Sequence, residues 1–120
     1  MCIRDSRLAP LSEEFGNNIL ELLKKNSDLD GIFATSDVMA ANIIRACKKM
    51  GKRVPEDISI VGFDDTWIST LTYPSITTIH QPVQEMCEYA IEAIVKKVKS
   101  EKVPSQVVFP VELIDRESTK

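Results

Sequence analysis

The sequence has few of the residues on which catalytic and metal sites depend. Its 120 residues include one histidine, His80, four glycines and three cysteines. The cysteines Cys2, Cys47 and Cys87 have neither metal-ligand nor C-x-x-C spacing, and the glycines form no phosphate-binding loop. No serine stands in a nucleophile-elbow motif. We therefore expect no catalytic residue, no bound metal and no cofactor.

Long apolar runs and a cationic surface are also missing. No window approaches the ~20 apolar residues of a membrane-spanning helix, and residues 1–10 contain no apolar signal-peptide core. The formal net charge is −3. Because proteins that grip DNA cluster their basic residues, these 120 residues are not expected to bind DNA themselves. We expect a cytoplasmic protein without membrane contact.

What is present suits one globular domain. Apolar residues make up 43% of the chain and charged residues 28%, which is ordinary. A chain of this length buries roughly two-thirds of its unfolded surface, so a single core is feasible. Cys47 and Cys87 fall on apolar positions of expected helices, and we expect both to be small buried hydrophobic residues.

The chain is organised around Val54 to Asp65, VPEDISIVGFDD. Its β-branched run from Ile58 to Phe63 predicts a short strand that is buried on both faces. Gly62 allows another backbone to come close, and Asp64 and Asp65 end the run with side chains that favour turns. The strand therefore brings two carboxylates to one edge of a sheet.

A similar run lies upstream. Gly31 to Ser36 predicts a strand, and the pattern from Val38 to Met50 predicts an amphipathic helix. A strand, a helix and a strand joined by short turns form a right-handed crossover with parallel strands. Asp37 and Asp64 are then expected at the same carboxyl edge, outside which open parallel sheets bind their ligands.

Further elements are expected on both sides of this unit. Ser12 is placed to cap a helix that ends near Asn26, and Ile76 to Gln81 predicts a strand. A helix should begin at Pro82 and end in a lysine-rich turn that we interpret as a solvated face. Val107 to Leu113, interrupted by Pro110, predicts a last strand.

Four segments together resemble one family. VPEDISIVGFDD, ATSDVMAANIIRACKKMG, YPSITTIHQP and the closing REST are similar to the effector-binding domain of the lactose-repressor (LacI/GalR) family of bacterial transcriptional regulators. The resemblance implies an α/β fold. It would be an incomplete, parallel-sheet, periplasmic-binding-protein-like (type I) lobe, with a helix and a strand that belong to the second lobe. Residues 11–120 would then be the C-terminal part of the effector-binding and dimerisation domain. Residues 1–10 match nothing in the family pattern, and we interpret them as an artefactual or truncated start.

The resemblance also implies the ligand and its site. The family binds a small effector, usually a sugar or sugar derivative, between its two lobes. Asp64 corresponds to the ligand-binding aspartate, Ser36 to a polar position that is often Asn, and Gln81 to a polar position where the chain crosses between the lobes. An ionised carboxylate can accept two sugar hydroxyls at once. Either Ser36 or Asp37 must cap the following helix, so Asp37 has two candidate roles, capping of that helix or contact with the ligand.

Dimer contacts are implied by the same resemblance. In the family, the helix after the first strand and the loop after the aspartates form much of the subunit interface, which points to Ala41, Arg45 and Thr72. Trp67 in that loop either takes part in such a contact or covers the sheet edge. Operator DNA would be reached only through a helix-turn-helix module that these 120 residues lack.

Three other kinds of protein share part of this pattern. A periplasmic sugar-binding protein of an ABC transporter would share the two-lobed architecture and the carboxylates at the sheet edge. A two-component receiver domain would place its acidic pair near the chain start and a lysine after a later strand, where this chain has Gln81. An enzyme would have to combine Ser36, Asp64 and His80 as a triad.

Overall fold

The computed structural model describes residues 13–120, with side chains from residue 17 onward. Residues 1–10 and the expected helix cap Ser12 lie outside the described residues. The chain forms two compact units, which are described separately below. The described residues up to His80 form the first unit together with Leu113–Lys120, and Gln81–Glu112 form the second.

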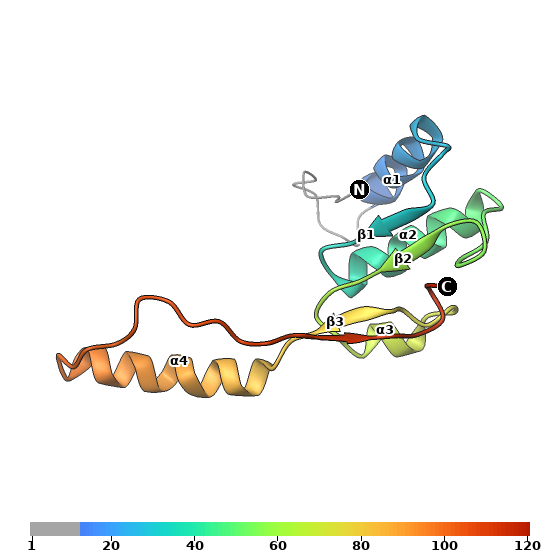
Figure 1. The fold of residues 1–120 in the computed structure, drawn as a ribbon. Coiled ribbons are helices and arrows are strands. Elements are labelled where there is room, and N and C mark those ends of the chain that lie inside the picture. Colours follow the sequence, from blue (N-terminus) through green and yellow to red (C-terminus); the bar gives the residue numbers. More distant parts are fainter. Residues whose placement is uncertain (1–12) are drawn as a thin grey trace. The chain divides into compact units, whose positions relative to one another are not determined.

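The first unit alternates helices and strands (Figure 1). Its elements are α1 (Glu13–Lys25), β1 (Gly31–Phe33), α2 (Asp37–Lys49), β2 (Ser59–Val61), α3 (Ile68–Leu71) and β3 (Thr78–His80). The second unit contains α4 (Val83–Val98), and β4 (Glu112–Ile114) crosses the boundary between the units. The three long helices lie within two residues of their expected positions, and the strands are shorter than expected.

The predicted parallel crossover is confirmed. β1 and β2 pair in parallel, with Ile32 opposite Ile60 and Phe33 opposite Val61. Beyond this ladder, parallel bridges join Val61 to Thr77 and Asp64 to His80, so β3 continues in the same direction beside the β2 segment. The carboxyl ends of all three strands therefore lie at one edge.

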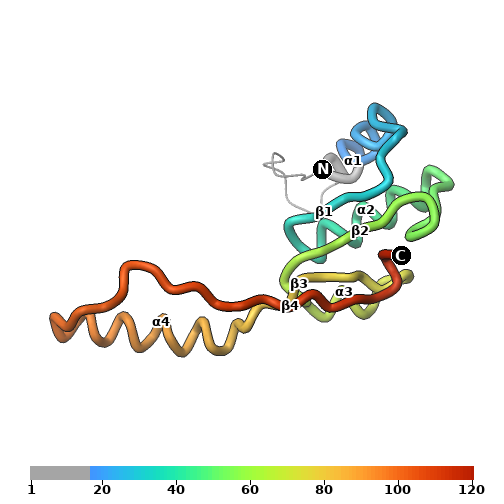
Figure 2. Tube along the Cα trace, viewed as in Figure 1, coloured from blue at the N-terminus to red at the C-terminus, as the bar shows by residue number. Residues whose placement is uncertain are grey.

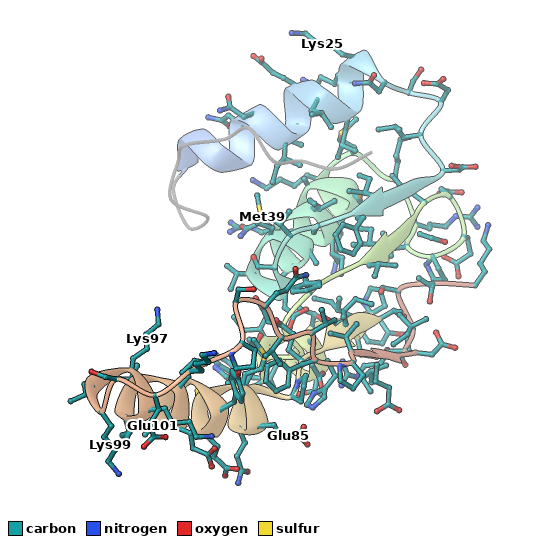
Figure 3. The ribbon with its side chains drawn as sticks, turned by 60° about the vertical axis from the view of Figure 1, so that its left-hand side comes forward. Lys25, Met39, Glu85, Lys97, Lys99 and Glu101 are labelled. Carbon is teal, nitrogen blue, oxygen red and sulfur yellow. The ribbon has the colours of Figure 1, made fainter. Side chains whose placement is uncertain are left out.

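In the core of the first unit, α1 and α2 pack against these strands. Its fully buried apolar side chains come from α1, α2, β2 with the residue before it, and the segment before β3: Ile19, Leu23, Ile43, Cys47, Ile58, Ile60 and Ile76. Met39, which is labelled in Figure 3, also belongs to this cluster. Cys47 is buried as expected, and its burial raises the pKa of the thiol. Ser59 and Val61 are only half-buried, so the expectation that this strand is buried on both faces is wrong for its second face.

Two local predictions need correction. The last strand begins at Glu112 and not at Val107, because Pro110 has no N–H group to donate to a neighbouring strand. The segment from Thr66 to Ser75, expected as a loop, contains the short helix α3. Its four residues are too few to show a helical repeat of apolar positions, so no periodic pattern predicts a helix there.

The second unit consists mainly of α4. The helix has no buried side chain, and Cys87 is exposed, so the prediction that Cys87 is buried is wrong. Within residues 81–112, α4 is the only helix and has no sheet to pack against; Tyr89 contacts Phe109 edge to face. Figure 3 shows Lys97 and Lys99 pointing away from the helix, which agrees with the solvated lysine face expected there.

Candidate functional site

The site is built where β1, β2 and β3 end. The Asp37 amide donates to the Phe63 carbonyl oxygen at 2.9 Å, and the Asp64 amide donates to Ile79 O at 3.0 Å. These bonds hold the three chain segments side by side just past their strands. The prediction that Asp37 and Asp64 emerge at the same carboxyl edge is confirmed.

Ser36 begins α2. Its hydroxyl oxygen accepts the Met39 amide at 3.3 Å, so Ser36 is the N-cap of the helix. The bond uses an acceptor position of the hydroxyl and leaves its proton available for donation. Ser36 is half-buried at the edge.

Asp37 has a role that the sequence did not indicate. Its carboxylate is fully buried. Oδ2 accepts the Thr66 amide at 2.6 Å and the Thr66 hydroxyl at 3.0 Å, while Oδ1 accepts the Thr78 hydroxyl. The expectation that Asp37 caps the helix is wrong, because Ser36 does so and Asp37 is the first helical residue. Asp37 instead ties the turn after β2 to β3.

Gly62 makes this arrangement possible. A Cβ atom at Gly62 would collide with Asp37 Oδ1 and would lie 3.0 Å from Ile76 Cγ2. The close approach predicted at this glycine is confirmed, and the group that approaches is the α2 aspartate with its backbone.

Asp64 and Asp65 adopt backbone conformations that residues other than glycine rarely use. Their φ angles are 100° and 52°, and such conformations persist only where surrounding contacts enforce them. The Asp37 contacts to Thr66 and Thr78 lie on either side of this turn. Asp64 is half-buried and not enclosed in the core, so its side chain belongs to the edge.

Asp65 contacts two side chains, His80 and Arg116, and the sequence predicted neither contact. Its Oδ2 lies 3.0 Å from His80 Nδ1, and its Oδ1 lies 2.7 Å from Arg116 Nη2. Burial alone would raise the pKa of the Asp65 carboxyl, but the hydrogen bonds and charges of Arg116 and His80 together outweigh burial and lower the pKa. The closing REST motif was the only sequence signal for Arg116. The motif did not predict which residues the Arg116 side chain contacts.

The predicted dimer residues Ala41 and Arg45 lie on α2, and Thr72 directly follows α3, which contacts α2. Arg45 is exposed, while Ala41 and Thr72 are half-buried. Near them, Trp67, Leu71 and Tyr73 are 71%, 72% and 87% exposed. The interpretation in which Trp67 covers the sheet edge is wrong, because a side chain so exposed covers little.

Gln81 is half-buried and is the first residue of the second unit. The structure therefore brings Ser36, Asp37 and Asp64 together at one edge of the first unit, and Gln81 follows His80 directly in the chain.

The side chains gathered at this edge offer hydrogen-bond acceptors. Among the side chains of residues 17–120, no group of three or more His, Cys, Asp or Glu could hold a metal ion. In the same range the His80 side chain is hydrogen bonded to Asp65 and to no serine, so the Ser36, Asp64 and His80 triad is not assembled. No helix of the described chain is both long and apolar enough to cross a membrane.

A parallel α/β unit with acidic side chains at the carboxyl edge of its strands defines a ligand-binding lobe of the periplasmic-binding-protein type. The family model described as periplasmic binding protein-like domain matches residues 6–119. The chain belongs to this family, in the form found in the effector-binding domains of lactose-repressor-type transcriptional regulators.

Individual relatives agree with this assignment. The ribose operon repressor of Halalkalibacterium halodurans is 37% identical over 100 residues, which are 82% of this chain and 30% of the relative. A CelR–cellobiose complex superposes with a TM-score of 0.80 at 33% identity, over 86% of this chain and 32% of that one. A lac repressor dimer bound to operator and an anti-inducer gives a TM-score of 0.81 at 28% identity, over 90% and 38%. The chain thus spans about a third of the length of these relatives.

Proposed function

We propose that the chain is the effector-sensing and dimerisation part of a DNA-binding transcriptional regulator whose effector is a small sugar. The observation that carries the proposal is the position of Asp64, at a constrained turn where β2 ends, beside Ser36 and β3. The regulators among its relatives, one of which is in complex with cellobiose, support the sugar assignment.

Asp64 is the principal contact in this proposal. An ionised carboxylate accepts two neighbouring sugar hydroxyls through charge-assisted hydrogen bonds. Ser36 donates its remaining hydroxyl proton to a third oxygen, and Gln81 is a further contact by its sequence position. We assign Asp37 a positioning role because both of its oxygens already accept protein hydrogen bonds. Its direct contact with the effector stays a prediction.

The dimer surface is proposed at α2 and α3. Trp67, Leu71 and Tyr73 form an exposed apolar patch, and contiguous patches of this kind mark interaction sites. Arg45, Ala41 and Thr72 lie on the same two elements or directly after them. The lac repressor that matches this chain is a dimer, which supports a second copy as the partner.

Regulation would work by a population shift. A sugar that binds one conformation of the dimer more tightly favours that conformation, and the change alters the affinity of attached DNA-reading modules. DNA contact would come from outside these 120 residues, whose net charge is −3. Such a regulator acts in the cytoplasm and catalyses no reaction. The regulators among its relatives favour this proposal over a transporter component.

The test uses the complete protein that carries this chain. Thermal unfolding is measured with a panel of pentoses, hexoses and disaccharides, and operator binding is measured with each sugar that raises the melting temperature. A sugar at 100 times its Kd should stabilise the protein by about 2.7 kcal/mol and change operator affinity. If no sugar stabilises the protein or alters DNA binding, the proposal is wrong.

A further inference from the structure

The side chain of Arg116 connects three parts of the first unit. Its Nη2 donates to Asp65 Oδ1 at 2.7 Å, and its Nη1 lies 2.9 Å from both Ser69 Oγ and the Ile76 carbonyl oxygen. Asp65 follows the effector-binding aspartate, Ser69 belongs to α3, and Ile76 precedes β3. One guanidinium group therefore contacts the sheet edge, α3 and the entry to β3.

The C-terminal tail holds Arg116 in place. In Figure 2 the red tail runs beside β3 and ends near β2. The Arg116 amide donates to the Thr77 hydroxyl at 2.9 Å, and Glu117 Oε2 accepts both the amide and the hydroxyl of Ser75 at 2.9 Å. Because these bonds hold the tail backbone to this segment, only the side chain of Arg116 can adjust when Asp65 moves.

We propose that Arg116 couples the effector site to the dimer surface. The inference rests on the proposed function, in which Asp64 binds the sugar and α3 carries the subunit contact. A sugar that hydrogen bonds to the Asp64 carboxylate displaces the backbone of the adjoining Asp65. The guanidinium group of Arg116 donates to both Asp65 and Ser69. A shift of Asp65 therefore moves this group, and the group in turn moves Ser69 and α3.

The chemistry of arginine suits this role. Its planar group presents several donors in fixed directions, whereas a lysine ammonium is a point charge on a flexible stem and cannot reproduce the three contacts. The Arg116 and Asp65 side chains are each 18% exposed, so solvent screens their interaction weakly. A contiguous network of hydrogen bonds and ion pairs can carry coupling between two sites, and a direct measurement of the coupling tests it.

The chain offers a matched control. Arg53 Nη2 lies 2.7 Å from Asp57 Oδ1, the same distance as in the Arg116–Asp65 pair, but the two side chains are 69% and 35% exposed. The Arg53–Asp57 pair lies in the turn before β2, at the opposite end of that strand from Asp65. Exposed pairs of this kind contribute little. The same substitution in both pairs therefore separates coupling from a general loss of an ion pair.

The experiment compares Arg116→Lys with Arg53→Lys in the complete protein. Sedimentation gives the dimer dissociation constant with and without sugar, and the ratio of the two constants is the coupling factor. We expect a factor of about 5 to 150 in the unmodified protein. The factor should be unchanged in Arg53→Lys and should lie within about twofold of 1 in Arg116→Lys, which should still bind the sugar.

A coupling factor in Arg116→Lys equal to that of Arg53→Lys would overturn the inference and leave Arg116 as a brace of the fold. Far-ultraviolet circular dichroism at the working temperature verifies that each variant is folded. Absence of sugar binding in the unmodified protein contradicts the proposed function instead. In that case the dimer dissociation constant without sugar shows whether Arg116 supports the dimer surface. Loss of the contact between Arg116 and α3 should weaken the dimer at least tenfold in Arg116→Lys and not in Arg53→Lys.

Discussion

At the scale of single residues, the turn after β2 depends on one glycine and one buried carboxylate. Asp37 accepts three hydrogen bonds there, and the space for its Oδ1 atom exists because residue 62 has no side chain. Buried carboxylates need such partners, since desolvation of an unpaired charge is costly. The geometry of Asp64 and Asp65 follows from this packing.

The Gly62→Ala substitution should destabilise the protein. Its Cβ would overlap Asp37 Oδ1 and press on Ile76, and overpacking of this kind costs about 1 to 3 kcal/mol. Urea unfolding gives the free energy. The matched control is Gly31→Ala in β1, where the nearest atom to a new Cβ is Ser59 O at 3.9 Å. It should leave stability unchanged or raise it by up to about 1 kcal/mol. Equal effects of the two variants would contradict the description of this turn.

Sequence reasoning at this scale located residues better than it assigned their roles. It placed Asp64 and Asp37 at one edge because the ends of parallel strands follow from order along the chain. It could not assign Asp37 its partners, because Thr66 and Thr78 lie 29 and 41 residues away and no pattern signals such contacts. The partners of Asp65 were missed for the same reason.

At the scale of elements, the tail residues Arg116 to Thr119 act as a further strand-like segment. The Ser118 hydroxyl donates to Ile60 O and accepts the Thr77 amide at 2.8 Å, and the Ile60 amide donates to Ser118 O at 2.8 Å. Ser118 is fully buried. The tail thereby links β2 to the β3 segment.

Ser118→Ala should weaken this link. The substitution leaves the buried Thr77 amide without an acceptor, and an unsatisfied buried group costs about 1 to 3 kcal/mol. Amide hydrogen exchange should show faster exchange at Thr77, and urea unfolding should show the loss of stability. Ser27→Ala, at an exposed site after α1, serves as the control. Unchanged exchange at Thr77 would mean that the tail does not hold this segment.

Stability should also depend on pH through Asp65. The pKa of its carboxyl is lowered in the folded protein, while an unfolded aspartate titrates near a pH of about 3.9. The resulting stabilisation is therefore fully present above the unfolded pKa and is lost as the pH falls through the folded pKa. In urea titrations, the difference between the unmodified protein and Asp65→Asn should be largest near neutral pH and should shrink as the pH falls below about 4. A difference that stays constant or grows towards acid pH would refute this.

The long helices were predictable, whereas the short helix α3 and the start of β4 were not. Helices of 13 and 16 residues repeat their apolar positions several times, which gives a strong signal. The four-residue helix α3 is too short to repeat its apolar positions. The start of β4 depends on its pairing with β3, a strand that lies far from it in the chain. Cys87 was expected to be buried because apolar periodicity identifies a helix face but does not say what covers it.

At the scale of the whole molecule, a second copy of the chain is expected at α2 and α3. Leu71→Glu should shift the complete protein from dimer to monomer in sedimentation experiments, because a charge would have to be buried in the subunit contact. Leu71 is exposed within one chain, so the unfolding free energy of the monomer should change by no more than about 0.5 kcal/mol. Ser27→Glu adds the same charge elsewhere and should leave the dimer intact. A dimer that persists in Leu71→Glu would place the interface on another surface.

The central claim is that Asp64 binds the sugar. The most direct test is calorimetric titration of the complete protein and its Asp64→Asn variant with the sugar that gives the largest thermal stabilisation. Asparagine tolerates the positive φ of this position but loses the charge, and hydrogen bonds to charged groups contribute about 1.5 to 3 kcal/mol. We predict that the sugar Kd rises about 10- to 150-fold in Asp64→Asn. The Kd should stay unchanged in the control variant Asp28→Asn, because Asp28 is exposed and lies away from the carboxyl ends of the strands. An unchanged Kd in Asp64→Asn would contradict the account.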